Sequence, residues 1–186
     1  MHKKFKHLIE KLNKTKTVFK GKFLKIIEDT VDLPNNDKAI REYVAHPGAA
    51  AIIAINDENK IAIIHQYRHC VKQVMVEIPA GKIDPNEDHL DTAKRELLEE
   101  TGISAKNWTY LGSVLPCIGY SDEEIFYYLA KDLHLGRQKL DHGELVEVEF
   151  IDQNKLLQLA KQNQVTDGKT LSGLMLYLGY LEQQAQ

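Results

Sequence analysis

The sequence is poor in cysteine, has no excess of basic residues and lacks any long apolar run, and each shortage excludes a class of protein. Cys70 and Cys117 are the only cysteines in 186 residues, and neither has a second Cys or a His at zinc-binding spacing. Free thiols of this kind fit a reducing compartment. The net charge of -3 and pI near 6.2 leave no basic surplus for a row of phosphates, so we expect no nucleic-acid partner.

Segments for export or membrane insertion are also missing. Residues 1–6 are basic, but no apolar stretch of the kind found in a secretory signal follows them. The longest apolar run, residues 49–55, is far too short to span a bilayer. We therefore expect a cytoplasmic protein with no membrane partner.

The remaining composition is that of a folded protein. Hydrophobic residues make up 43% of the chain, which is enough for a substantial core. The length suits one domain of ordinary size with an additional arm, and there is no internal repeat or low-complexity tract.

An acidic cluster stands out in the stretch 81–103. Glu96, Glu99 and Glu100 fall within five residues, so on a helix their carboxylates would share one face and repel one another. A solvated acidic face is the ordinary reading of such a run. A hard divalent cation is the alternative, because it takes oxygen ligands and neutralises carboxylates held close together.

The flanking residues indicate that this helix packs against the protein. Apolar and small residues recur at helical spacing beside the carboxylates, namely at Leu90, Ala93, Leu97 and Thr101. Gly102 is placed to end the helix as a left-handed cap. Arg95, one residue before the cluster, is placed to orient carboxylates through charge-assisted hydrogen bonds.

Two starting points for this helix stay open. Asp84 could be the N-cap, with Pro85 at the first helical position and Glu87 closing a capping box. Asp88 is the alternative N-cap, and the sequence does not decide between them.

The same stretch resembles a known motif. Every fixed position of the Nudix box is occupied in this chain, by Gly81, Glu87 and the run 95–103 (RELLEETGI). The resemblance implies an α/β/α sandwich with a mixed sheet that hydrolyses nucleoside diphosphates linked to another moiety, using Mg²⁺, for which Mn²⁺ can substitute. It also implies metal ligation by Glu96 and Glu100, assistance from Glu99 and the carbonyl of Ala80, bracing by Arg95 and Glu87, and structural roles for Gly81 and Gly102.

Residues 1–45 precede the expected Nudix domain, residues 46–186. Residues 5–12 have apolar spacing that favours a short helix, packed or lying on a membrane surface. Strands are expected at 18–19, 23–27 and 40–45, with a turn at 34–37. In sugar-nucleotide members of the family, a small N-terminal antiparallel sheet of this kind packs across a homodimer and closes the substrate site, and this chain resembles that arrangement.

The core is expected to begin with two nearly continuous apolar strands, 49–55 and 61–67, joined as a hairpin through a polar turn. Such strands are typical of a sheet covered on both faces. The second ends at Arg68, a side chain suited to bidentate phosphate contact. In ADP-ribose pyrophosphatases a similar Gln-aromatic-Arg segment carries an arginine near the diphosphate, and residues 77–81 also resemble that subfamily.

Two later segments carry further candidate residues. Between expected strands at 108–115 and 125–130, residues 116–123 resemble the subfamily's substrate loop and keep Ser121, but Ile118 stands where a proline is expected. Glu144, just before a strand at 145–151, matches a mobile loop that carries the catalytic glutamate in the subfamily. A carboxylate there could deprotonate the attacking water, and His142 is a competing base.

The C-terminal part is expected to form two helices, the first capped by Asp152 and the second following residues 167–170. An apolar stripe in the second helix predicts core packing, at Leu171, Leu174, Met175, Leu178 and Leu181. Tyr177 and Tyr180 are candidates for an interface.

Together these features predict a Mg²⁺-dependent hydrolase of ADP-ribose or a related nucleoside diphosphate sugar, yielding a nucleoside monophosphate and a sugar phosphate. Glu144, Glu99 and Arg95 form the expected catalytic set, and Arg68, Glu42, Tyr43 and Ser121 the expected substrate contacts, with Phe19, Phe23 and Tyr43 as unranked candidates for stacking on the base. The alternatives are hydrolysis of another nucleoside diphosphate derivative, such as GDP-mannose or a dinucleoside polyphosphate, and a non-catalytic nucleotide sensor.

Overall fold

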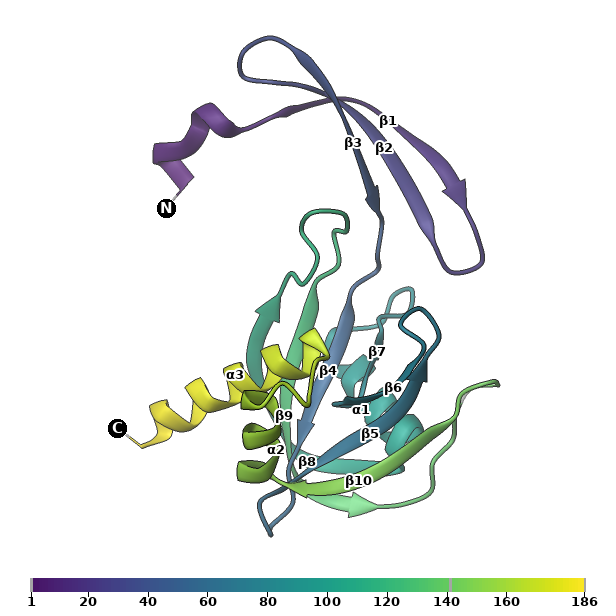
Figure 1. Cartoon of the computed structure of the whole chain (residues 1–186), viewed down its shortest axis with the longest axis vertical. Helices are drawn as coiled ribbons and strands as arrows, with labels where there is room; N and C mark the ends of the chain where they lie inside the picture. The colour runs from purple at the N-terminus through teal and green to yellow at the C-terminus, as the bar shows by residue number, and fades with distance from the viewer. Residues whose placement is uncertain (1, 141, 186) are drawn as a thin grey trace. The chain divides into compact units, whose positions relative to one another are not determined.

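A computed structural model describes residues 2–140 and 142–185 (Figure 1). Chain contacts divide it into two compact units. The first unit is Met1–His46 with Cys117–Glu123, and the second is Pro47–Pro116 with Glu124–Gln186. The domain boundary at residues 45/46 stays a prediction.

The first unit is built on a three-stranded antiparallel sheet in the order β1-β2-β3. A short 3-10 helix, His2–Leu8, precedes β1 (Lys11–Lys20), β2 (Lys25–Asp32) and β3 (Lys38–Val44). The β2–β3 turn needs a left-handed residue, which Asn36 supplies with φ 70°. The predicted helical run over residues 5–12 is wrong at its end, because Leu12 lies in β1, where the antiparallel ladder with β2 replaces helical hydrogen bonds.

The second unit contains two further sheets. One has the order β7-β4-β9-β8, with β4 (Ala49–Ala54) parallel to β9 (Ile125–Leu135) and antiparallel to β7 (Ala80–Lys82), while β8 (Ile103–Val114) is antiparallel to β9. The other has the order β10-β5-β6, formed by β5 (Lys60–Arg68), β6 (Gln73–Glu77) and β10 (Val146–Asp152). The mixed sheet that the resemblance implies is therefore present.

The expected hairpin between the first two core strands is wrong. The polar turn forms, and Ile55 and Ile61 make an isolated antiparallel bridge across it. Beyond that bridge, β4 and β5 diverge into different sheets. β4 is buried along its whole length and β5 is buried over residues 61–64, so each finds partners on both edges instead of pairing with the other.

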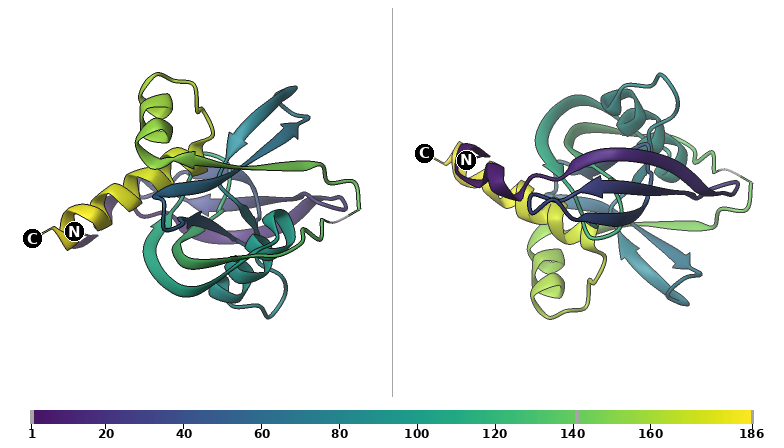
Figure 2. Two further views of the ribbon diagram at one scale, coloured as in Figure 1. Left: turned by 90° about the horizontal axis from the view of Figure 1, so that it is seen from below. Right: turned by 90° about the horizontal axis from the view of Figure 1, so that it is seen from above.

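Helices cover both faces of β4, with α1 (His89–Thr101) on one side and α2 (Gln153–Lys161) and α3 (Gly168–Gln184) on the other (Figures 1 and 2). Ala51 and Ile53 pack in one cluster with residues of α2 and α3. Ala50 and Ile52 pack in a second cluster with residues of α1. Strand alternation thus creates the α/β/α arrangement.

The helix caps agree largely with the sequence. Asp152 caps α2 and Asp167 caps α3, each accepting backbone N–H groups of the first turn. Asp88, not Asp84, caps α1, accepting from the Leu90 amide at 2.8 Å.

The predicted apolar stripe of α3 is only partly correct. Leu174 is buried, but Met175 is 76% exposed, and the residues buried beside Leu174 are Thr170, Gly173 and Tyr177. Gly173 allows the close packing, because a Cβ there would lie 2.8 Å from Ile78 Cδ1. Tyr177 is therefore a core residue, whose hydroxyl donates to Gln153 Oε1 at 2.9 Å.

Candidate active site

The acidic face of α1 lies against the backbone of β7. A Cβ on Gly81 would fall 1.9 Å from the Glu96 carboxylate carbon, so only glycine permits this approach. Gly102 ends the helix with φ 71°, and its N–H bonds to the Leu98 carbonyl at 2.8 Å. Both glycines expected to be structural thus have a geometric reason.

Arg95 joins the carboxylates of this face into one network. Its Nη1 donates to Glu96 Oε1 at 2.6 Å and to Glu99 Oε2 at 3.2 Å. Its Nε and Nη2 make a bidentate pair with Glu87 at 2.9 and 2.8 Å. Nη2 also reaches the Lys82 carbonyl at 3.1 Å. A planar guanidinium with this many partners fixes the direction of each carboxylate.

Glu87 is held by more than Arg95. Its Oε2 accepts from the Thr92 hydroxyl at 2.7 Å and from the Asp84 amide at 3.3 Å. The bond to Asp84 is the reciprocal half of a capping box, although the helix itself begins five residues later at His89. The hydrogen bonds from Arg95 lower the pKa of Glu87 to about 2.

The pKa of Glu100 is shifted in the opposite direction. It is 5% exposed, and burial raises its pKa to about 8, with the charges of Glu96 and Glu144 adding to the effect. A hydrogen bond from the Ala80 amide to Oε2, at 2.9 Å, opposes the rise only in part. Burial likewise raises the pKa of Glu96, in spite of its bond to Arg95.

The donor set fits a hard cation. Glu96, Glu99 and Glu100 offer carboxylate oxygens, and those of Glu96 and Glu100 lie where ionisation is costly without a positive partner. In the two described ranges, no three His, Cys, Asp or Glu side chains already converge on one point. Two of the three glutamates, Glu96 and Glu99, point toward Arg95 instead, because each forms an ion pair with its guanidinium.

Glu144 lies close enough to the acidic face of α1 to affect the ionisation of its carboxylates. Its charge contributes to the raised pKa of both Glu96 and Glu100. The preceding residue, Gly143, has φ 92°, a conformation that favours glycine. His142, the competing base, is exposed.

The structure adds two candidate site residues that the sequence analysis missed, Glu77 and Lys169, and both are linked to Arg68. Arg68 does not extend freely from β5, because its Nε and Nη2 both bond to the buried carboxylate of Glu77, each at 2.7 Å. Lys169, at the start of α3, bonds to the same carboxylate. A lone Glu within the apolar run 74–78 was the available signal for Glu77, whereas Lys169 approaches from 92 residues away.

Three expected substrate contacts belong to the first unit. Glu42 and Tyr43 lie in β3, where they pair with Glu28 and Ile27 of β2. Ser121 lies in the segment 117–123, and its hydroxyl donates to the Val44 carbonyl at 3.1 Å. Burial, together with the charges of Asp29 and Asp122, raises the pKa of Tyr43.

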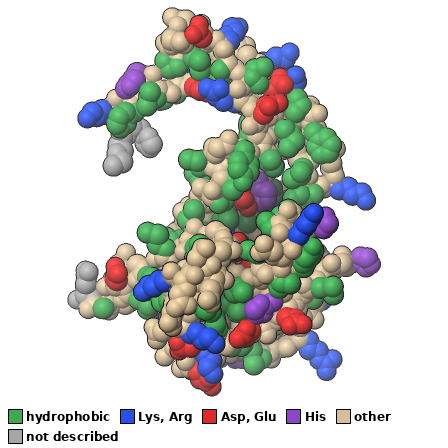
Figure 3. Space-filling view, viewed as in Figure 1, with side chains coloured by type: hydrophobic (Ala, Val, Ile, Leu, Met, Phe, Trp, Pro, Cys, Tyr) green, Lys and Arg blue, Asp and Glu red, His purple; other side chains and the backbone are tan. Residues whose placement is uncertain are grey.

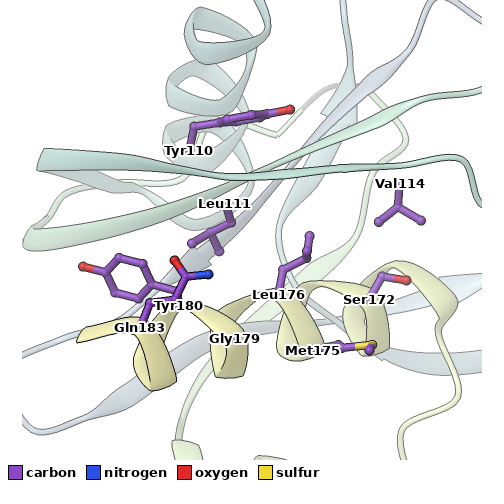
Figure 4. Close-up of a pocket in the computed structure, with 9 residues that line it drawn as sticks. All are labelled: Tyr110, Leu111, Val114, Ser172, Met175, Leu176, Gly179, Tyr180 and Gln183. Atoms are coloured by element: carbon purple, nitrogen blue, oxygen red, sulfur yellow. The ribbon is translucent and has the colours of Figure 1, made fainter. Parts of the chain in front are cut away.

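A separate apolar cavity of about 410 Å³ lies between β8 and α3 (Figure 4). Leu111 and Leu176 face each other across it, while Tyr110 lies on the other side of β8. Its lining contains no carboxylate, so it is not part of the acidic site.

Comparison with known proteins identifies this arrangement. Residues 45–172 match the model of the NUDIX domain. The chain therefore belongs to the Nudix family of hydrolases. None of the helices in the described residues is long and apolar enough to cross a membrane.

Individual relatives are similar over most of their length. The methanol dehydrogenase activator of Bacillus methanolicus is 42% identical over 164 residues, covering 87% of this chain and 89% of that protein. The ADP-ribose pyrophosphatase of Bacillus subtilis (strain 168) is 39% identical, with coverage of 89% and 90%. A crystal structure of an ADP compounds hydrolase has the same fold, with a TM-score of 0.82, 20% identity and coverage of 95% and 97%.

Proposed function

We propose that this protein is a Mg²⁺-dependent pyrophosphohydrolase that cleaves ADP-ribose, or a related nucleoside diphosphate sugar, to a nucleoside monophosphate and a sugar phosphate. The carrying observation is Glu100, a buried carboxylate whose pKa is raised to about 8 beside Glu96 on a helix braced by Arg95. A group with this pKa in a candidate site is suited to functional chemistry. The similarity to an ADP-ribose pyrophosphatase supports the choice of substrate.

In this proposal the acidic face of α1 holds the metal. Glu96, Glu99 and Glu100 are the carboxylate ligands, and the Ala80 carbonyl is an additional one. When bound, Mg²⁺ supplies charge neutralisation at the diphosphate and a lowered pKa of the attacking water. Arg95 keeps Glu96 and Glu99 oriented through its bonds of 2.6 and 3.2 Å.

The remaining roles fall on two side chains of the second unit. Arg68, whose side chain is 41% exposed, binds the diphosphate through its guanidinium. Glu144 accepts the proton of the attacking water, since its charge already acts on Glu96 and Glu100. The P–O bond of the diphosphate breaks as the water oxygen bonds to phosphorus, and the leaving phosphate carries away the negative charge.

We assign recognition of the nucleoside to the first unit. Phe19, Phe23 and Tyr43 are the aromatic side chains available for stacking, and Glu42 and Ser121 are the polar contacts. Phe19 and Phe23 are 54% and 68% exposed, which leaves their rings accessible.

We further propose a homodimer assembled through the N-terminal sheet. Every residue of β1 is exposed, including Leu12, Val18 and Phe19. Apolar side chains gather on the surface in the upper part of Figure 3, where Figure 1 draws this sheet. Large apolar side chains exposed together on one sheet are typical of an interaction site. Light scattering after gel filtration tests it: a dimer mass is expected, and a monomer mass at working concentration would refute it.

The experiment that tests the activity is Mg²⁺-dependent hydrolysis of a panel comprising ADP-ribose, ADP-glucose, GDP-mannose, UDP-glucose, a dinucleoside polyphosphate and NADH, with products separated by chromatography. We expect preferred turnover of ADP-ribose or another sugar nucleotide, to monophosphate and sugar phosphate. Turnover only of the dinucleoside polyphosphate would assign another substrate class. Binding without turnover would indicate a sensor.

A second candidate is activation of a methanol dehydrogenase, favoured by the relative of that name at 42% identity. The two relatives differ by only three percentage points in identity, so similarity does not separate them. Methanol oxidation by a methanol dehydrogenase, measured with and without this protein, distinguishes them. A rate increase that Glu100→Gln abolishes would show that the same acidic site serves this activity.

A further inference from the structure

A buried carboxylate fixes the orientation of Arg68. Glu77 is 1% exposed and accepts Nε and Nη2 of Arg68 in a bidentate pair, at 2.7 Å for each contact. This geometry sets the plane of the guanidinium. Within the described residues, the remaining nitrogen, Nη1, donates to no protein group. One edge of the guanidinium is thus held by the protein while another is left for a ligand.

The sheet register shows that this orientation is imposed. Arg68 is paired with Gln73 across the β5–β6 ladder, whereas Glu77 is paired with Ile64. Side-chain alternation places residues 64, 66 and 68 on one face of β5, so Arg68 reaches Glu77 only by folding back along its own strand. A surface arginine without such a partner would extend into water.

Lys169 completes the charge balance of the cluster. Its ammonium group bonds to Glu77 and, at 2.9 Å, to Asp167 Oδ2, and its side chain is 13% exposed. Glu77 and Asp167 carry two negative charges, which Arg68 and Lys169 together match. Without Lys169 the cluster would have an excess negative charge that repels a diphosphate.

The start of α3 also holds the backbone that follows Glu77. The Thr170 hydroxyl accepts the Ile78 amide at 2.9 Å and donates to Asp167 Oδ2 at 2.7 Å. Thr170 is completely buried. The helix terminus therefore fixes Glu77 through both its side chain and the next peptide group.

We propose that Glu77 and Lys169 are positioning residues that present the free edge of Arg68 to the diphosphate of the substrate. Neither touches the substrate. The inference rests on the proposed function for the identity of the substrate, and its test includes a measurement that does not depend on turnover.

The kinetic test compares Glu77→Gln, Arg68→Met and the double variant. Loss of a charge-assisted hydrogen bond predicts a rise in the KM for ADP-ribose of about tenfold or more in Glu77→Gln, with a smaller change in kcat. Because Glu77 acts through Arg68, adding Glu77→Gln to Arg68→Met should cost almost nothing further. An equal loss in both backgrounds, or an unchanged KM in Glu77→Gln, would overturn the proposal.

Lys169 supplies a second series in case Glu77→Gln does not fold. Lys169→Met should raise KM in the same direction, and Lys169→Arg should restore most of the loss by restoring the charge. The matched control is Glu10→Gln, which removes a bidentate carboxylate from Arg41 on the first unit, at 2.5 and 3.1 Å. It should leave KM unchanged. A loss in Lys169→Arg as large as in Lys169→Met would contradict the charge argument.

The turnover-independent test observes arginine Nε–H groups by ¹⁵N NMR in metal-free buffer. The chain has only four arginines, so Arg68 is identified by the signal that Arg68→Lys removes. Inorganic pyrophosphate should shift this signal in the wild type and not in Glu77→Gln. The same response in both proteins, or none in the wild type, would overturn the proposal. If the wild type hydrolyses no nucleotide of the panel but Arg68 responds as expected, the proposed function fails and the positioning role stands.

Discussion

In two pairs of glutamates of this protein, the carboxyl pKa is shifted in opposite directions. Glu87 and Glu77 each receive a bidentate arginine, Arg95 and Arg68 respectively. The Arg95 bonds lower the pKa of Glu87 to about 2. Burial raises the pKa of Glu77, yet the bonds and charges of Arg68 and Lys169 keep this pKa below its usual value. Burial instead raises the pKa of Glu96 and Glu100.

In the proposed site, this difference gives one side-chain type two purposes. The carboxylates with lowered pKa are already neutralised by protein cations, so they can orient other groups but have little affinity left for a metal. Those with raised pKa lack sufficient protein cation, and a divalent ion would relieve the cost of ionising them. In the proposed site, bracing and metal binding thus fall on different residues.

The largest effect is expected from removing a binding carboxylate. Glu100→Gln should lower Mg²⁺-dependent turnover of ADP-ribose at least about 100-fold, because a bound metal supplies several kcal/mol of charge stabilisation. In metal-free buffer it should not be less stable than the wild type at pH 8, since it lacks the buried charge. Steady-state kinetics and thermal denaturation measure the two effects. Glu147→Gln, at an exposed position of β10, is the control, and full turnover in Glu100→Gln would contradict the assignment.

A smaller effect on turnover is expected from removing a bracing carboxylate. Glu87→Gln breaks the bidentate pair with Arg95 and should reduce turnover by about 10- to 100-fold, as for other groups that orient metal ligands. It should also cost about 2 kcal/mol of stability, measured by urea unfolding, because it weakens charged hydrogen bonds. Loss of stability without loss of turnover would show that Glu87 supports the fold alone.

The two carboxylate types should also differ in pH dependence. Glu100 has a folded pKa near 8 against 4.5 for the unfolded chain, so its contribution to stability is full below pH 4.5 and is lost as pH rises through 8. Glu87 has the reverse dependence, with stability present above pH 4.5 and lost as pH falls toward 2. Urea unfolding against pH, for the wild type and Glu100→Gln without metal, should show the wild type losing stability relative to the variant between about pH 4.5 and 8, the range set by the unfolded and folded pKa values of Glu100. Parallel curves would refute the raised pKa.

The smallest effect is expected at a surface pair. Arg41 and Glu10 have bidentate geometry like Arg68 and Glu77, but the side chain of Glu10 is 33% exposed, against 2% for Glu77. Solvent screens such pairs, so Glu10→Gln should leave turnover unchanged and the melting temperature within measurement error. A large change in turnover would show that the geometry of a pair, and not its burial, decides its importance.

The sequence predicted what depends on local spacing. The α1 carboxylates, Arg95 and the Gly102 cap all lie within one helix, where a three- or four-residue interval determines the neighbour. The partner of Glu77, Lys169, lies 92 residues away and leaves no local signal. For the same reason the separation of β4 and β5 into different sheets was missed, since their turn has hairpin chemistry while burial decides their partners.

A similar limit explains why the buried face of α3 was only partly predicted from the sequence. Its apolar spacing fits several rotations of the helix, and the small side chain of Gly173 selects the one that buries Leu174 and Tyr177 instead of Met175. The choice between Asp84 and Asp88 as N-cap was also open in the sequence. It is settled by Asp88, whose side chain accepts the Leu90 amide at 2.8 Å and whose carbonyl accepts the Thr92 amide at 2.9 Å.

The most direct test of the central claim is calorimetric titration of the substrate-free protein with Mg²⁺ at pH 8, for the wild type, Glu100→Gln and Glu147→Gln. The account predicts saturable binding in the wild type and in Glu147→Gln, and its loss in Glu100→Gln. Equal binding in all three proteins would contradict the assignment of the acidic face of α1 as the metal site.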